Sequence, residues 1–309
     1  MVFGAKIILI AILILCFSGW ISPPAALTVG IIFGLSLRHP YPDLSCSVAR
    51  VLLQMSVVAL GFGMNLHEVV KAGRSGFVYT ALGIAFALLA GLAIGKFLRI
   101  GGNASYLITS GTAICGGSAI AAIGPILHAD DEEMAVSLGT VFILNSIALL
   151  AFPPIGNALH LTQSQFGLWA ALAIHDTSSV VGAAAKYGQE ALVVGTTVKL
   201  ARALWIVPLA LVTAAVKRSK TRVPLPWFIG FFSLAAVINT YVPSLSNFDR
   251  WAFTAGRRGL TATLFLIGTG ISIATLKTVG WRPLLQGVIL WLVIASVTLY
   301  LIRLRIILF

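Results

Sequence analysis

Apolar segments about as long as a bilayer is thick fill most of this chain. A transmembrane helix needs roughly 20 mainly apolar residues, and eleven segments of the 309-residue sequence come close to that length. They lie near residues 6–21, 23–37, 50–66, 76–98, 104–127, 133–155, 165–187, 190–216, 224–241, 257–276 and 284–303. Only 10% of the residues are charged and 59% are hydrophobic. These features predict an all-α polytopic membrane protein with about 11 transmembrane segments, folded as one membrane domain over residues 1–309.

Basic residues set the expected orientation. The net charge of +12 would suggest a nucleic-acid partner in a soluble protein, but here the Lys and Arg residues lie mostly in short loops. Topology and contact with membrane lipid explain them, so we expect no nucleic-acid partner. The side that carries the N-terminus has eleven of these residues and the other side has eight, which favours a cytoplasmic N-terminus. Lys6 and the apolar run after it resemble a signal peptide, but no A-x-A site follows, so we expect a first transmembrane helix.

No group of residues predicts a metal ion or a cofactor. The three cysteines lack metal-ligand spacing, and Cys16 and Cys115 lie in apolar segments, where we expect them to pack as small hydrophobes. The acidic run at residues 130–133 begins an expected helix, whose dipole favours negative charge at that end. We therefore interpret this run as a solvated helix N-terminus rather than a cation site.

The sequence contains two internal similarities. The motif LGFGM at residues 60–64 matches IGTGI at residues 267–271, so segments two to four are expected to recur as segments nine to eleven. Seven segments separate the copies, and because seven is odd the copies would be inverted, as is typical of secondary transporters. The repeat-like halves would cover about residues 23–157 and 165–303.

The second similarity joins two units that each consist of a broken helix followed by a long helix. Glu133 and the helix after it align with Glu190 and the helix after that residue. If every segment crosses the membrane the two units are parallel, whereas an inverted arrangement requires one segment to re-enter. The pattern leaves both arrangements open.

Two polar runs interrupt the apolar segments, TSGTAICGGSAIAAIG at residues 109–124 and HDTSSVVGAAA at residues 175–185. Helix-breaking polar sequence is tolerated at membrane depth only where it lines a cavity or is buried in protein, so two such runs predict a small solute held near the midplane. Helices that begin at these breaks would present N–H groups and a partial positive charge. The residues expected to bind the solute there are Gly116, Gly117, Ser118, Thr177, Ser178 and Ser179. The alternative is that the serines only bridge neighbouring helices.

Four ionisable residues are expected at membrane depth, where such groups usually have a function. Lys199 and Arg202 are three residues apart and therefore share one helix face. We expect them to form an anion site, with a structural pairing to Asp176 or to backbone carbonyls as the alternative. His175 and Asp176 open the second polar run and are the candidates for proton coupling.

The runs GTAICGGSAIAA (111–122) and HDTSSVVGAA (175–184), with KLARALWIVP (199–208) after the second, look like the YeiH-type family. Its members are bacterial inner-membrane proteins described as sulfate exporters, and the resemblance covers essentially the whole chain. It implies a multi-pass protein of the bacterial inner membrane with inverted repeats and crossed broken helices. It also implies a distant relation to cation–proton antiporters and anion transporters.

The sequence therefore predicts a secondary transporter of a small inorganic or organic anion, possessing a core built on two broken helices. The resemblance points to a sulfate-like or sulfite-like substrate. A cation–proton antiporter that uses Asp176 is the first alternative. An intramembrane hydrolase with Ser179 and Lys199 is a weaker one, because a G-x-S-x-G elbow is absent and we expect no enzymatic activity. The sequence is compatible with a homodimer.

Overall fold

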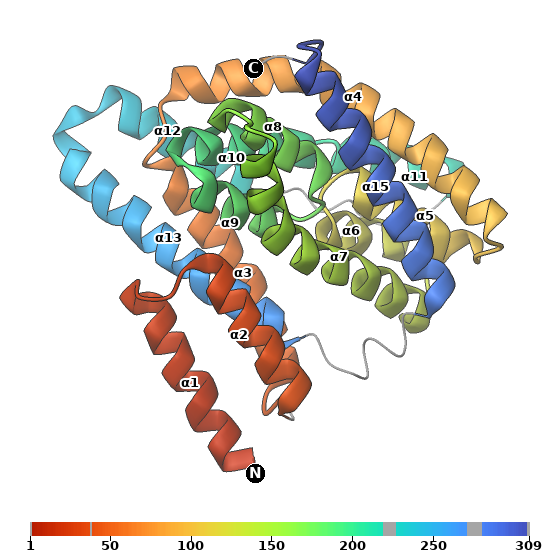
Figure 1. Ribbon diagram of the computed structural model, residues 1–309, viewed down its shortest axis with the longest axis horizontal. Coiled ribbons are helices and arrows are strands. Elements are labelled where there is room, and N and C mark those ends of the chain that lie inside the picture. Colours follow the sequence, from red (N-terminus) through yellow and green to blue (C-terminus); the bar gives the residue numbers. More distant parts are fainter. Residues whose placement is uncertain (1, 38, 219–226, 271–279, 308–309) are drawn as a thin grey trace. The chain divides into compact units, whose positions relative to one another are not determined.

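A computed structural model describes residues 2–37, 39–218, 227–270 and 280–307, and its elements are labelled in Figure 1. The ordered elements in these ranges are helices, with no strand among them, which agrees with the expected all-α class. The chain forms two compact units. Unit 1 comprises Met1–Val70 and Trp227–Ile273, and unit 2 comprises Lys71–Pro226 and Ala274–Phe309.

Unit 1 is built around one long helix. Its elements are α1 (Val2–Ser18), α2 (Pro23–Ser36), α3 (Pro42–Gly61), α12 (Trp227–Tyr241), the short 3-10 helix η1 (Pro243–Leu245) and α13 (Ser246–Thr269). Helix α13 packs against α1, α2 and α3, and α12 packs against α3. Proline at the start of α2 and of α3 suits a helix N-terminus, where its missing N–H would have no partner in any case.

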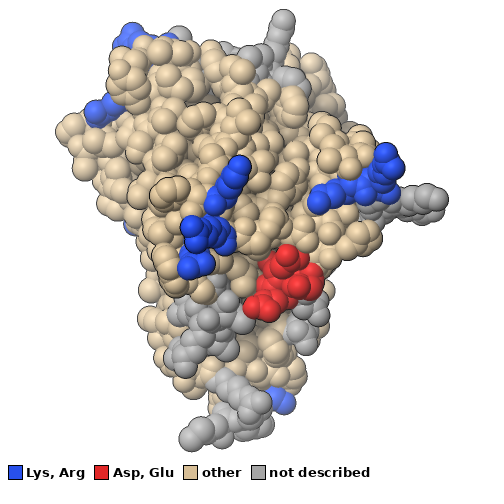
Figure 2. Space-filling model, turned by 90° about the vertical axis from the view of Figure 1, so that its right-hand side faces the viewer, with Lys and Arg blue, Asp and Glu red and all other residues tan. Residues whose placement is uncertain are grey.

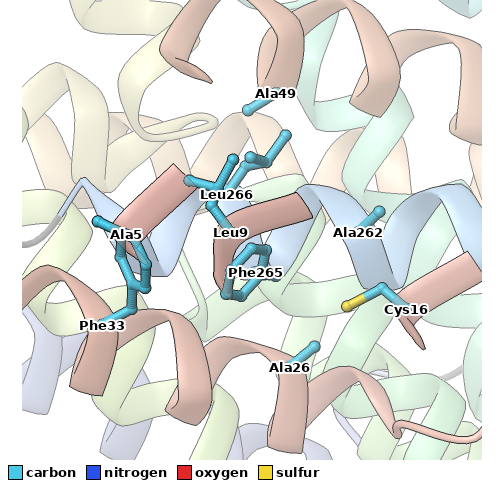
Figure 3. Close-up of a cluster of buried hydrophobic side chains, with 9 residues drawn as sticks. All are labelled: Ala5, Leu9, Cys16, Ala26, Phe33, Ala49, Ala262, Phe265 and Leu266. Carbon is cyan, nitrogen blue, oxygen red and sulfur yellow. The ribbon is translucent and has the colours of Figure 1, made fainter. Parts of the chain in front are cut away.

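Small residues let the helices of unit 1 approach closely, as is common between membrane helices. A Cβ on Gly30 of α2 would collide with the backbone of Phe265 in α13, and a Cβ on Gly256 of α13 would lie 2.8 Å from the Ser56 carbonyl oxygen of α3. Figure 3 shows the apolar cluster between α1, α2, α3 and α13, in which Cys16 packs as a small hydrophobe. Cys115, in unit 2, is likewise buried.

Unit 2 contains four candidate membrane spans together with two pairs of short helices. Its elements are α4 (Leu66–Phe97, from Lys71 on), α5 (Gly102–Ala113), α6 (Gly117–Leu127), α7 (Asp131–Ala158), α8 (Gln163–Ala173), α9 (Thr177–Tyr187), α10 (Gln189–Ala203), α11 (Ile206–Lys217) and α15 (Trp281–Arg303). The pairs of short helices are α5 with α6 and α8 with α9. The acidic run caps α7 as expected. The Asp130 carboxylate accepts the Glu133 N–H at 2.8 Å, and the Glu133 carboxylate accepts the Asp130 N–H at 3.2 Å.

The expected count of eleven transmembrane segments is wrong for the described residues. Five helices are long and apolar enough to cross a membrane, and a sixth span results if Trp227–Tyr241 and Pro243–Thr269, bent by 101°, count as one. The five are Leu44–Gly61, Tyr79–Phe97, Glu132–Ala158, Gln189–Lys217 and Trp281–Arg303. Segments 104–127 and 165–187, which the sequence predicts to be broken, are split into helices of 11 or 12 residues. Hydropathy along the sequence does not distinguish one long apolar helix from two short ones.

The described residues do not support the expected inverted repeat of segments two to four in segments nine to eleven. Gly61 is the last residue of α3 and packs against Phe232 of α12, whereas Gly268 lies inside α13 and packs against Leu27 of α2. Residues 271–279, which would extend the second copy, lie outside the described part of the chain. The two halves proposed from sequence stay a prediction.

The surface has the sparse charge of a membrane protein. On the face drawn in Figure 2, Lys, Arg, Asp and Glu side chains form a few small patches separated by wide uncharged areas. Large apolar side chains are exposed on many helices, among them Leu89 on α4 and Leu292 on α15. Exposed apolar area on this scale is unusual for a soluble protein and is expected where lipid is the solvent.

Candidate functional site at two hairpin tips

Helices α5 and α6 fold back on each other as a helical hairpin, which we call hairpin A. Its base lies at the start of α7, because the Asn103 side-chain amide donates to Glu133 at 3.1 Å. Gly124 of α6 also packs directly against the Met134 side chain, leaving no room for a Cβ. Between the base and the tip, Leu107 of α5 packs with Ile120 of α6 in one apolar cluster. The tip consists of residues 114–116.

Helices α8 and α9 form a second hairpin, hairpin B, whose base lies at the other end of α7. The Tyr187 hydroxyl at the end of α9 donates to the Leu161 carbonyl just before α8 at 2.7 Å. The Tyr187 ring stacks on Phe166 at 3.8 Å, and Trp169 stacks on Phe152 of α7 at 4.1 Å. The tip consists of residues 174–176.

The two tips meet beside Asn145, near the middle of α7. The Asn145 side-chain oxygen accepts the backbone N–H of His175 at 3.1 Å and that of Asp176 at 3.2 Å. A Cβ on Gly116 would lie 3.5 Å from the Asn145 side-chain nitrogen and 3.5 Å from the Asp176 Cα. The expectation that Gly117 and Ser178 lie in one central region, each at a helix end, is therefore confirmed. Gly117 is the first residue of α6, and Ser178 is the second residue of α9.

Lys199 and Arg202 of α10 bind the carbonyl ends of both hairpins. The Lys199 ammonium donates to the Ile114 carbonyl at 2.9 Å and to the Ile174 carbonyl at 2.7 Å. The Arg202 guanidinium donates to the carbonyls of Ala113 at 2.7 Å and Leu172 at 2.5 Å. Helices α5 and α8 end at these carbonyls, which have no partner inside their helices and carry partial negative charge.

This arrangement corresponds to the structural alternative weighed for the two cations. Both side chains are buried, with 0% of Lys199 and 2% of Arg202 exposed. Among the described residues, no carboxylate forms an ion pair with either cation. Each cation instead connects a carbonyl of hairpin A to a carbonyl of hairpin B, so α10 holds the two tips together.

The N-terminal ends at the two tips differ. Asp176 is the N-cap of α9, and its carboxylate accepts the Ser179 N–H at 3.2 Å and the Ser178 hydroxyl. At the other tip, the N-cap of α6 is Gly116, which has no side chain and forms no capping hydrogen bond. The Cys115 side chain interacts with the Ala119 N–H, so the N–H groups of Gly117 and Ser118 are the ones left for an external acceptor, whereas the amide end of α9 is already occupied by a carboxylate.

The remaining expected site residues lie around these tips. Thr177, Ser178 and Ser179 are buried in the first turn of α9, and Ser118 is exposed in the first turn of α6. His175 is 1% exposed, and neither of its ring nitrogens has a hydrogen-bond partner. Ser179 and Lys199, the pair considered for a hydrolase, share no hydrogen bond, since the Lys199 ammonium is directed to the two carbonyls.

Asn145 was not among the residues selected from sequence, although it contacts both tips. Its side chain is 3% exposed, and its side-chain nitrogen has no hydrogen-bond partner. The available signal was a single asparagine in the apolar run AVSLGTVFILNSIALLAFP. In the alignment of α7 with α10, Asn145 corresponds to Arg202. At this position the side chain of each helix contacts the hairpin tips.

A helical membrane protein with two hairpins whose tips meet inside one unit is the class defined by this geometry. Residues 2–287 match the family model described as "Conserved hypothetical protein 698", and the chain belongs to this family. A "UPF0324 membrane protein" of Bacteroides thetaiotaomicron is 53% identical over 91% of this chain and 86% of the relative. The "UPF0324 membrane protein Bd1437" of Bdellovibrio bacteriovorus is 50% identical over 96% of this chain and 93% of the relative. No solved structure matches the chain.

The relatives' names agree with a location in a membrane and state no substrate. The description of the family as sulfate exporters and its relation to antiporters therefore remain expectations. The shared length is nearly complete in both directions, so both hairpins and the helix that carries Lys199 and Arg202 fall within the matched region.

Proposed function

We propose that this protein is a secondary transporter of a small anion, with its substrate site at the tips of hairpins A and B. This proposal rests on one observation, namely that the carbonyl ends of the helices at the tips are paired with cations whereas one amide end is not paired with a carboxylate. The carbonyl ends of α5 and α8 are neutralised by Lys199 and Arg202, and the N-cap of α6 is a glycine that supplies no capping side chain. What is left unpaired is thus the positive end of a helix, which binds anions.

The dimensions of the hairpins support a site inside the bilayer. Helices of 11 or 12 residues are about 17 Å long at 1.5 Å per residue, roughly half of the hydrocarbon core. Because α7 is long enough to cross and the hairpin bases lie at its two ends, we infer that the hairpins enter from opposite sides of the membrane. Their tips would then meet near the midplane, where secondary transporters hold substrate.

Asp176 provides a route to proton coupling. The backbone of Asp176 lies beside Gly116, the residue before α6, since the position of a Gly116 Cβ falls 3.5 Å from the Asp176 Cα. An ionised carboxylate repels an anion at that place, whereas a protonated one does not. Binding of the anion together with a proton follows, and His175, buried without a partner in the same tip, is a second group that could accept the proton.

The substrate we favour is a sulfate-like or sulfite-like oxyanion, and the membrane is the bacterial inner membrane with a cytoplasmic N-terminus. Transport would proceed by alternating access. Since each cation joins carbonyls of both hairpins, the tips would move as one body during this step, because separating them would leave buried carbonyls or a buried charge without partners.

A transport assay tests this function. Purified protein is reconstituted into liposomes and exposed to jumps of sulfate or sulfite, with and without an inward proton gradient. We expect sulfate-dependent or sulfite-dependent charge movement that the proton gradient accelerates and that Asp176→Asn uncouples from pH. No response to either anion at any pH, in protein whose thermal midpoint shows that it is folded, would contradict the proposal.

Asp176 also supports a second candidate, a cation–proton antiporter. Its carboxylate lies at the meeting point of the tips and its side chain is partly exposed. In that case Asp176→Asn would abolish all ion-dependent current, and Na⁺ or K⁺ rather than sulfate would stabilise the wild-type protein. The same liposomes therefore separate the two candidates.

A further inference from the structure

The Asn145 side chain uses one of its two polar ends. Its oxygen accepts two backbone N–H groups of tip B, which fixes the amide orientation, but its nitrogen has no partner. The side chain is 3% exposed. Buried donors are almost always hydrogen-bonded in native proteins, so an unpaired one requires an explanation, and a missing ligand is one of them.

The unpaired nitrogen lies at tip A. A Cβ on Gly116 would be 3.5 Å from it, and Gly116 directly precedes the first turn of α6. With a φ of +65°, Gly116 adopts a conformation that L side chains rarely take, so this position stays free of a side chain. The Asn145 amide and the uncapped N–H groups of α6 therefore lie beside the same position.

We propose that Asn145 selects the substrate and that its side-chain nitrogen donates to an oxyanion bound at the start of α6. This inference rests on the proposed function. An anion with two or more oxygens can place one oxygen at the Asn145 amide and another at the α6 N–H groups at the same time. The charged or titratable groups at the tips are Cys115, His175, Asp176, Lys199 and Arg202, and the last two are already directed to carbonyls.

Asn145→Asp tests this role most directly. The substitution keeps an oxygen that accepts the N–H groups of tip B, and it replaces the N–H₂ donor with a second oxygen. Asn157→Asp is the matched control, because it adds the same charge to the same helix at an exposed position. Binding is followed as the rise in thermal midpoint with sulfate in detergent, with chloride at equal ionic strength as the comparison.

We expect sulfate to stabilise the wild type and Asn157→Asp alike, and the apparent Kd of Asn145→Asp to be at least 30-fold higher. Lower pH should partly restore binding by Asn145→Asp, because a protonated Asp loses its charge and regains one donor. Hydrogen exchange on the wild type gives a readout that needs no variant, since sulfate should slow the amides of Gly117 and Ser118.

The outcomes separate this inference from the proposed function. If sulfate and sulfite leave the wild type unchanged in both thermal midpoint and hydrogen exchange, the proposed anion site itself is refuted. If the wild type responds and Asn145→Asp binds sulfate equally well, the role of Asn145 is overturned and the anion site stands. Should Asn145→Asp fail to fold, unchanged exchange of Gly117 and Ser118 in sulfate-stabilised wild type overturns the role instead. Equal stabilisation by chloride contradicts the oxyanion.

Discussion

The two hairpin tips share a shape and differ in how their charge is balanced. In each tip a helix ends and the next begins after three residues, and the carbonyl ends of both receive the same pair of cations. The amide ends are opposites. Tip B carries its own carboxylate on Asp176, and tip A has a glycine and no cap. The comparison indicates that the helix end in tip B is capped by the chain itself, whereas the helix end in tip A is available to a ligand.

Removing the shared cation should have the largest effect, because it acts on both tips. Lys199→Met keeps an unbranched side chain and leaves the carbonyls of Ile114 and Ile174 without partners. An unpaired buried acceptor costs about 1–3 kcal/mol, so we expect the free energy of unfolding to fall by about 3 kcal/mol. Unfolding by SDS titration in mixed micelles measures it, with exposed Lys186→Met of α9 as the control, expected within about 0.5 kcal/mol of wild type.

The same variant tests whether the two tips are held together. Hydrogen exchange should become faster at the ends of both α5 and α8, since Lys199 donates to a carbonyl at each. Faster exchange in one hairpin alone would show that the tips are held independently. It would contradict the conclusion that Lys199 holds both tips together.

The two tips also differ in backbone conformation, and this difference should have the second-largest effect on stability. Gly116 has a φ of +65°, whereas His175 and Asp176 of tip B do not have positive φ. Gly116→Ala should therefore cost about 2 kcal/mol, the usual size of strain for a side chain in such a conformation. Gly102→Ala, at the start of α5 where a Cβ meets nothing within 4 Å, is the control and should be neutral or slightly stabilising. Equal midpoints for both variants would argue that tip A relaxes to an ordinary conformation.

The carboxylate of tip B should control what binds at tip A. Asp176→Asn keeps an oxygen that can cap α9 and removes the negative charge. Unit charges about 4 Å apart repel by about 1 kcal/mol in bulk water and by about 4 kcal/mol at an effective dielectric of 20, so sulfate should bind at least about tenfold more tightly at neutral pH. Sulfate affinity equal to that of the wild type would mean that the two tips are electrostatically independent.

Sequence alone predicted the breaks but not the hairpins. Glycine, serine and threonine in runs 109–124 and 175–185 mark positions where an apolar helix stops, and both helices do stop there. Whether the chain continues or turns back depends on contacts such as that of Tyr187 with Leu161, which join residues 26 positions apart and leave no local pattern. Two of the eleven expected spans, 104–127 and 165–187, failed for this reason. Others failed because α1 and α2 are too short to qualify and because α12 and α13 belong to one bent pair.

The candidate site was predictable in part for a related reason. The cations Lys199 and Arg202 are conspicuous in an apolar helix. Their hydrogen-bond acceptors, however, are backbone carbonyls, which cannot be identified from residue types in the sequence. Asn145 is the opposite case. A single polar residue in a long apolar helix carries little information until the fold brings both tips to its side chain.

The smallest effects on stability should come from removing the hydroxyls of Ser178 and Ser118, which occupy equivalent positions in the two tips. Ser178 and Ser118 are each the second residue of their helix, α9 and α6. Ser178 is buried and donates to the Asp176 carboxylate, whereas Ser118 is exposed and has no capping role. Ser178→Ala should therefore lower the free energy of unfolding by about 1 kcal/mol, as expected for one buried hydrogen bond.

Ser118→Ala should change stability by less than about 0.5 kcal/mol, as is usual for an exposed position, because its backbone N–H remains. Its effect on sulfate affinity should also be small if the anion is held by α6 N–H groups and by Asn145, and larger if the hydroxyl itself is a ligand. SDS titration and the sulfate thermal shift on the same two samples distinguish these cases. A larger loss of stability from Ser118→Ala than from Ser178→Ala would reverse the assignment of which tip is structural and which is open.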